Sequence, residues 1–122
     1  MNDKKLQKLI DFYEQCPLEC DGMVQVLNTV LLANNVKCTV FGGTVSRHNV
    51  TVPLHFWIEL VDRRFVDLRA RMWLGNEVSV PHGIFRPQDY PEVVYKGRQG
   101  NFTPVSDTLF SILTNNLPIL IL

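Results

Sequence analysis

The chain has 122 residues, with 12 basic and 12 acidic side chains, 46% hydrophobic residues and 20% charged residues. This length fits a single domain with its own hydrophobic core, and the zero net charge argues against nucleic acid as a partner, because phosphate binding draws on a surplus of Lys and Arg. No apolar run approaches the roughly 18 residues of a membrane span, so no membrane partner is expected.

The first 16 residues, MNDKKLQKLIDFYEQC, lack the apolar stretch of a secretory signal. Three cysteines, at positions 16, 20 and 38, do not make a disulfide framework, so we expect reduced thiols and a cytoplasmic location. These cysteines and His55 lack the paired short spacings of a zinc site. We therefore expect no metal and no other cofactor.

Two helices are predicted in the N-terminal third of the chain. Apolar residues recur at spacings of three and four from about Lys4, which predicts an amphipathic helix that Pro17 stops. From Cys20 to about Asn34 the apolar residues cover most of the helical circumference, which is typical of a helix buried against a sheet. The second helix should therefore lie at the centre of the domain.

Strands are predicted to follow. Val36 to Phe41 alternates and should stop at a turn formed by Gly42-Gly43, with a polar loop from Thr44 to Thr51. Val52 to Val61 and Arg64 to Leu68 should form a hairpin. The order of elements predicts an α+β domain, with N-terminal helices packed on a mainly antiparallel sheet.

The C-terminal part is less regular. Residues 75 to 104 are rich in Pro, Gly and aromatic residues, which predicts extended segments and structured loops. Ser106-Asp107 indicates the start of a helix from Thr108 to Thr114. The apolar tail from Leu117 to Leu122 is either a final strand or an exposed interaction segment.

Cys20 is the candidate nucleophile. It stands where the buried helix begins, and the unpaired N–H groups and positive dipole end of a helix start stabilise a thiolate. The adjacent carboxylate of Asp21 opposes a second negative charge, so the thiol needs a basic partner. A buried cysteine that only packs is the structural alternative.

His55 and Asp67 are the candidate partners of Cys20. A carboxylate bonded to one imidazole nitrogen fixes the tautomer and leaves the other nitrogen free to serve the thiol. A regular two-residue turn at Asp62-Arg63 would put Asp67 opposite Ile58, on the face away from His55. We therefore predict a three-residue loop or a bulge in this hairpin.

The sequence resembles the transglutaminase-like superfamily of papain-like cysteine enzymes over about Cys20 to Leu68. The resemblance is carried by Cys20-Asp21-Gly22, by Asn35-Val36-Lys37-Cys38 in register 15 residues after the cysteine, by His55-Phe56-Trp57-Ile58-Glu59-Leu60 and by Phe65-Val66-Asp67. In that family a nucleophilic cysteine opens a buried helix, and a strand with the histidine precedes a strand with the aspartate. The resemblance implies a single transglutaminase-like domain over residues 1–122, with Cys20 as nucleophile, His55 as general base and acid, and Asp67 as the residue that orients His55.

The function that follows is a cysteine-dependent hydrolase or acyltransferase, acting on a peptide or carboxamide bond through a thioester acyl-enzyme. A peptidase, amidase or glutamine deamidase fits the short chain, with a peptide or protein as substrate. The alternative is a non-catalytic transglutaminase-like module that binds a protein partner.

Further candidates complete the predicted site. Gln15 is a candidate side-chain donor for the oxyanion, beside the backbone N–H of Cys20. Trp57, Phe85 and Tyr90 are candidates for the wall of a substrate groove, and core packing is the alternative for these aromatic residues. Cys16 and Cys38 are expected to be packing residues.

Overall fold

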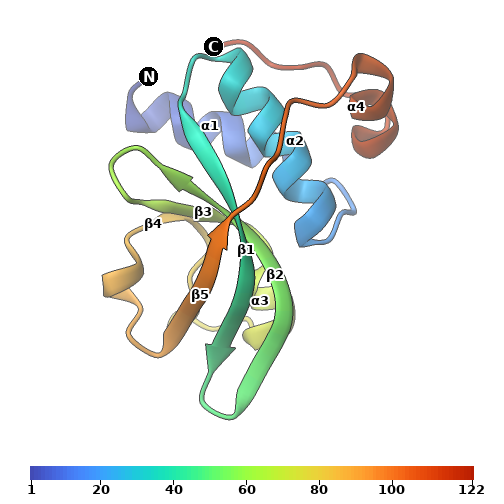
Figure 1. Ribbon diagram of the computed structural model, residues 1–122. Coiled ribbons are helices and arrows are strands. Elements are labelled where there is room, and N and C mark those ends of the chain that lie inside the picture. The colour runs from blue at the N-terminus through green and yellow to red at the C-terminus, as the bar shows by residue number, and fades with distance from the viewer.

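The fold is described from a computed structural model of residues 1–122 (Figure 1). In chain order the elements are α1 (Asp3–Tyr13), α2 (Cys20–Ala33), β1 (Cys38–Arg47), β2 (Val50–Leu60), β3 (Phe65–Asp67), α3 (Ala70–Leu74), β4 (Gly83–Phe85), the short 3₁₀ helix η1 (Pro87–Asp89), β5 (Val93–Gln99) and α4 (Asp107–Thr114). The five strands form one sheet in the order β4-β3-β2-β1-β5, and every neighbouring pair is antiparallel. The predicted α+β class is confirmed.

The helices begin where side chains can satisfy their first N–H groups or where the chain turns. The Asn2 side chain accepts a hydrogen bond from the Lys5 N–H at the start of α1, and Ser106 does the same for Leu109 at the start of α4. α2 begins at Cys20, the predicted residue, and its middle is buried between the sheet, α1 and α4. Figure 1 shows α1, α2 and α4 gathered at one end of the sheet.

The first strand differs from the prediction. β1 does not stop at Gly42-Gly43 but continues to Arg47, and the expected polar loop is a hairpin that turns at His48 and Asn49. The glycines mark a close approach of two backbones. A Cβ on Gly43 would lie 2.1 Å from the carbonyl oxygen of Lys96 on β5, so only glycine fits there.

The hairpin of β2 and β3 has the predicted three-residue loop. Ile58 pairs with Val66 and Glu59 with Phe65, and the Leu60 N–H donates to the Arg64 carbonyl across the loop at 2.8 Å. Arg63, the last loop residue, has a φ of 74°, the left-handed conformation that commonly closes such loops. This register brings His55 and Asp67 onto one face of the sheet.

The two faces of the sheet are covered differently. On one face, α1 and α2 pack on Val40, Ile58 and Val66 to form the main core. On the other face, aromatic rings of Trp57, Phe65, Phe85 and Tyr95 contact one another, and a smaller apolar cluster lies beneath α3. His55 and Asp67 belong to this second face.

The C-terminal tail is neither of the two predicted forms. It has no regular secondary structure, and Leu117, Ile119 and Leu120 pack partly against the main core. The Tyr13 hydroxyl donates to the Pro118 carbonyl and accepts from the Leu120 N–H, each at 2.7 Å. None of the helices has both the length and the hydrophobicity to cross a membrane.

Candidate active site

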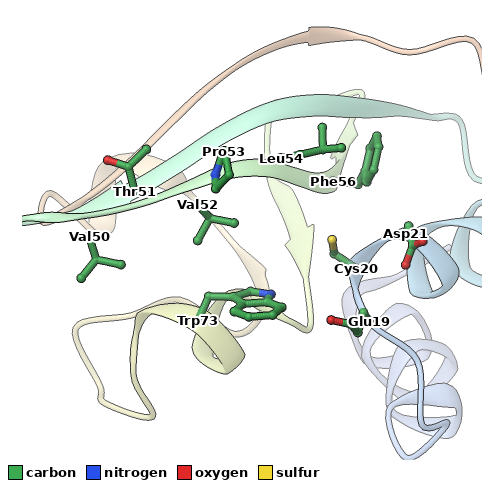
Figure 2. Close-up of a pocket in the computed structure, with 10 residues that line it drawn as sticks. All are labelled: Glu19, Cys20, Asp21, Val50, Thr51, Val52, Pro53, Leu54, Phe56 and Trp73. Carbon is green, nitrogen blue, oxygen red and sulfur yellow. The ribbon is translucent and has the colours of Figure 1, made fainter.

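The Cys20 side chain is half-buried at the first residue of α2. Glu19, the residue before it, is extended, and its side chain accepts no hydrogen bond from the N–H groups at this helix start. In Figure 2 the sulfur of Cys20 points away from the helix and toward β2. The thiol therefore lies between the positive end of a 14-residue helix and the strand that carries His55.

His55 and Asp67 form a buried pair. The Nε2 atom of His55 lies 2.7 Å from Oδ2 of Asp67, and the two side chains are 0% and 1% exposed. Asp67 is held by three more hydrogen bonds: Oδ1 accepts from the N–H groups of Arg69 at 2.9 Å and Ala70 at 3.0 Å, and Oδ2 also accepts from the hydroxyl of Tyr95 at 2.8 Å. Together with His55, four donors thus bind the two oxygens of this carboxyl group. The predicted contact between Asp67 and His55 is confirmed.

The bond to Asp67 fixes the role of each imidazole nitrogen. Nε2 donates to the carboxylate, while Nδ1 is buried and completes no hydrogen bond of standard geometry. Burial alone would lower the pKa of His55, but the interactions with Asp67 and with the Cys20 thiol outweigh it and raise the pKa to about 9. The thiol is thus close enough to act on the imidazole, and Nδ1 is the nitrogen that Asp67 leaves free for it.

A groove of about 500 Å³ opens beside Cys20. It is lined by the first part of β2, by Trp73 of α3 and by residues at the start of α2: Glu19, Cys20, Asp21, Val50, Thr51, Val52, Pro53, Leu54, Phe56 and Trp73. Figure 2 shows Cys20 at one end, beneath Phe56, with Trp73 facing β2 across the opening. The groove walls are mainly apolar, and the carboxylates of Glu19 and Asp21 lie at the Cys20 end.

The predicted groove residues are not in this groove. Trp57 and Phe85 are buried, and Tyr90 packs with its ring centroid 5.4 Å from that of Phe85. Trp57 shares with His55 the sheet face that the aromatic rings cover, whereas the groove follows the beginning of β2, which was predicted to be partly loop. Core packing, the stated alternative, is therefore the correct assignment for Trp57 and Phe85, while Tyr90 lies half-buried beside Phe85 and outside the groove.

Gln15 does not line this groove either. Gln15 is exposed and lines a separate hollow formed with Glu14, Pro17 and Met72, which does not include Cys20. The reason is the path of the connection between α1 and α2. The Arg69 guanidinium donates to the carbonyls of Glu14 and Cys16, each at 2.9 Å, and this holds the connection with Gln15 outside.

Arg69 itself was not recognised as a site residue. Its guanidinium also donates to the carbonyls of Leu18 and Leu68. No sequence pattern indicates these contacts, because three of the four acceptors, the carbonyls of Glu14, Cys16 and Leu18, lie more than 50 positions earlier in the chain. Arg69 thereby joins the segment that follows Asp67 to the segment that leads into Cys20.

The other two cysteines lie apart from the groove, as packing residues. Cys16 is buried in the main core, and burial raises the pKa of its thiol. Cys38 packs beside Asn28, and burial raises its pKa to about 11. All three cysteines are free, and the structure contains no group of three or more His, Cys, Asp or Glu side chains arranged to hold a metal ion.

No protein-family model, curated protein or solved structure matches this chain. Inference about its function therefore depends on the geometry of the site. That geometry is a half-buried thiol at a helix start, a buried imidazole whose nitrogens have distinct roles, and a carboxylate with four hydrogen-bond donors.

Proposed function

We propose that this protein is a cysteine-dependent hydrolase or acyltransferase that acts on a peptide or carboxamide bond through a thioester at Cys20. The observation that carries the proposal is the buried pair of His55 and Asp67, which leaves Nδ1 of the imidazole for the Cys20 thiol. An imidazole with one nitrogen on a carboxylate and the other beside a thiol is the arrangement that activates a nucleophile, and the raised pKa of His55 favours transfer of the thiol proton to it.

The reaction follows from the roles of these three side chains. His55 Nδ1 accepts the thiol proton, and the thiolate sulfur attacks the carbonyl carbon to give a tetrahedral oxyanion. When the C–N bond breaks, His55 returns that proton to the leaving nitrogen, and a thioester remains. Water, or an amine in a transfer reaction, then attacks the thioester while His55 takes its proton, and the thiol is released with the proton restored.

The oxyanion would be stabilised by the start of α2. N–H groups in the first turn of a helix have no intrahelical acceptor, so the N–H of Cys20 is available to donate to it. The helix dipole adds positive potential at the same point. Gln15 does not line the groove, so the backbone donor is the one that we assign.

The groove supports a substrate with an extended, apolar segment. β3 pairs with β2 only at Ile58 and Glu59, so the edge of β2 from Val50 to Leu54 has no strand partner on that side. An extended peptide can bind such an edge through its backbone and place alternate side chains in pockets. An apolar side chain would lie between this edge and Trp73, with the scissile carbonyl at Cys20.

The arrangement of elements is consistent with a transglutaminase-like core, which we propose as the fold family. Cys20 opens a buried helix, and His55 and Asp67 stand on neighbouring antiparallel strands, the order in which the sequence resemblance has them. Three free cysteines fit a reducing compartment, and we propose a cytoplasmic location on that basis.

Selective alkylation tests the proposal. Iodoacetamide at pH 7, followed by mass spectrometry of the intact protein and its peptides, should modify Cys20 first, because burial raises the pKa of both Cys16 and Cys38. A fluorogenic peptide-amide library should then show turnover that Cys20→Ala abolishes. The matched variants Cys16→Ala and Cys38→Ala should retain most of the activity.

Two results would contradict this function. Equal modification of the three cysteines would mean that His55 does not activate Cys20. Selective modification without turnover or a trapped acyl-enzyme, together with binding of a library peptide, would instead favour the non-catalytic binding module.

A further inference from the structure

Tyr95 reaches the candidate site from a distant strand. It lies on β5, and both β1 and β2 stand between β5 and β3 in the sheet. Its hydroxyl nevertheless donates to Oδ2 of Asp67 at 2.8 Å, the same oxygen that binds His55. A hydrogen bond across two intervening strands needs a specific path for the side chain.

Two glycines lie beside Tyr95 where β1 and β5 approach closely. Gly43 of β1 stands opposite both His55 and Gly97 in the strand register, and Tyr95 is two residues from Gly97 on β5. A Cβ at Gly97 would lie 2.7 Å from the Trp57 ring, so this crossing has no room for side chains. The phenol of Tyr95 packs edge-on against Trp57, with ring centroids 4.9 Å apart.

We propose that Tyr95 is a positioning residue, which fixes the Asp67 carboxylate and through it the His55 imidazole for the reaction of Cys20. This inference rests on the proposed function. Oδ1 of Asp67 is held by two backbone N–H groups, whereas Oδ2 would have His55 as its only partner without Tyr95. The hydroxyl of Tyr95, from a separate strand, gives Oδ2 a second donor and fixes the position of the oxygen that binds His55.

The hydroxyl of Tyr95 is suited to this role because it remains a donor. Burial, together with the negative charge of Asp67 and the hydrogen bond to it, raises the pKa of Tyr95 far above its ordinary value. The ring is held by its contacts with Trp57, Phe65 and Phe85. Replacing Tyr95 by Phe keeps these ring contacts and removes only the donor.

The test compares three Tyr→Phe variants in the free protein. Tyr95→Phe removes the hydrogen bond to Asp67. Tyr90→Phe is the matched control in the same aromatic cluster, since Tyr90 also contacts Phe85. Tyr13→Phe removes two hydrogen bonds to the tail and controls for lost stability.

Two quantities are measured for each variant: solvent exchange of the His55 Nε2–H proton by NMR, and the rate constant for alkylation of Cys20 by iodoacetamide. In Tyr95→Phe we expect exchange to be about tenfold faster and alkylation about tenfold slower, equivalent to about 1.4 kcal/mol. Neither quantity should change in the two controls, even if Tyr13→Phe lowers the melting temperature as much as Tyr95→Phe does.

Unchanged exchange and alkylation in a folded Tyr95→Phe variant would overturn the inference and leave the proposed function standing. If that variant does not fold, 3,5-difluorotyrosine at position 95 keeps the ring and strengthens the donor. An unmoved His55 Nε2–H resonance in that protein would equally overturn it. If wild-type Cys20 shows no selective alkylation, the proposed function is wrong, and the positioning role of Tyr95 in that function is wrong with it.

Discussion

Replacing Asp67 by Asn should reverse the proton arrangement of His55. Asn has the same shape, and its oxygen can still accept from the N–H groups of Arg69 and Ala70 that now bind Oδ1. An NH₂ group then takes the place of Oδ2 and donates toward Nε2 of His55. A neutral imidazole must then accept this hydrogen bond at Nε2 and carry its own proton on Nδ1. Protonated Nδ1 can no longer accept the proton of Cys20.

The size of the effect follows from the environment of His55. Its pKa is raised from the ordinary 6.5 to about 9, although burial acts in the opposite direction. Without the carboxylate, the burial of a fully enclosed side chain is no longer opposed by Asp67, and the pKa should fall by 2 units or more, roughly 3 kcal/mol. Turnover should fall on the order of a thousandfold, because the tautomer is wrong for proton transfer.

The same substitution should change how stability depends on pH. The pKa of His55 in the folded protein lies above its unfolded value, so its contribution to stability is fully present below pH 6.5 and is lost as pH rises through about 9. Wild-type protein should therefore lose on the order of 3 kcal/mol in the free energy of unfolding over this range from His55. Asp67→Asn should not show this loss.

NMR titration of the His55 imidazole and urea denaturation at pH 6.5 and 9 measure both effects. Asp62→Asn is the matched control, since Asp62 carries the same charge on the exposed loop of the same hairpin. It should leave the titration of His55 unchanged. If Asp67→Asn moves the pKa of His55 no further than Asp62→Asn does, the carboxylate does not determine the state of the imidazole, and the proposed triad is wrong.

Two further predictions concern the sheet and the groove. Gly43→Ala would place a Cβ 2.1 Å from the Lys96 carbonyl oxygen, so β1 and β5 must separate. Chemical denaturation should show that the free energy of unfolding falls by about 2 kcal/mol or more. The control Gly22→Ala should change it much less, because the added Cβ would meet only the Leu18 side chain, at 3.1 Å. Trp73→Ala should raise KM for apolar peptides several-fold and change stability by less than about 0.5 kcal/mol, because the side chain is 47% exposed; an unchanged KM would show that substrates do not bind against Trp73.

Local rules predicted the parts of the site that depend on neighbouring residues. The start of α2 at Cys20 follows from the break at Pro17 and the apolar run after it. The face shared by His55 and Asp67 follows from the two-residue alternation of strands, once the loop between them has three residues. Both inferences use spacing along a short stretch of chain, and spacing is visible in the sequence.

The remaining features depend on segments that are distant in sequence. Gly42-Gly43 looked like a turn because a close approach of β5 and a chain reversal both require residues without a side chain. The groove is lined from α2, β2 and α3, so its residues share no spacing that a pattern can detect. Tyr95 stood out only as one aromatic residue among several, and its contact with Asp67 is set by a sheet order that the sequence does not state.

The four carbonyl contacts of Arg69 have a consequence for motion within the domain. Its guanidinium binds the chain just before Cys20, while its own backbone N–H binds Asp67. Thermal opening of the connection between α1 and α2 therefore also disturbs the carboxylate of Asp67. The segments that carry the thiol and the carboxylate should open and close as one cooperative unit, so that transient fluctuations remove the whole site rather than release a lone thiolate into solvent.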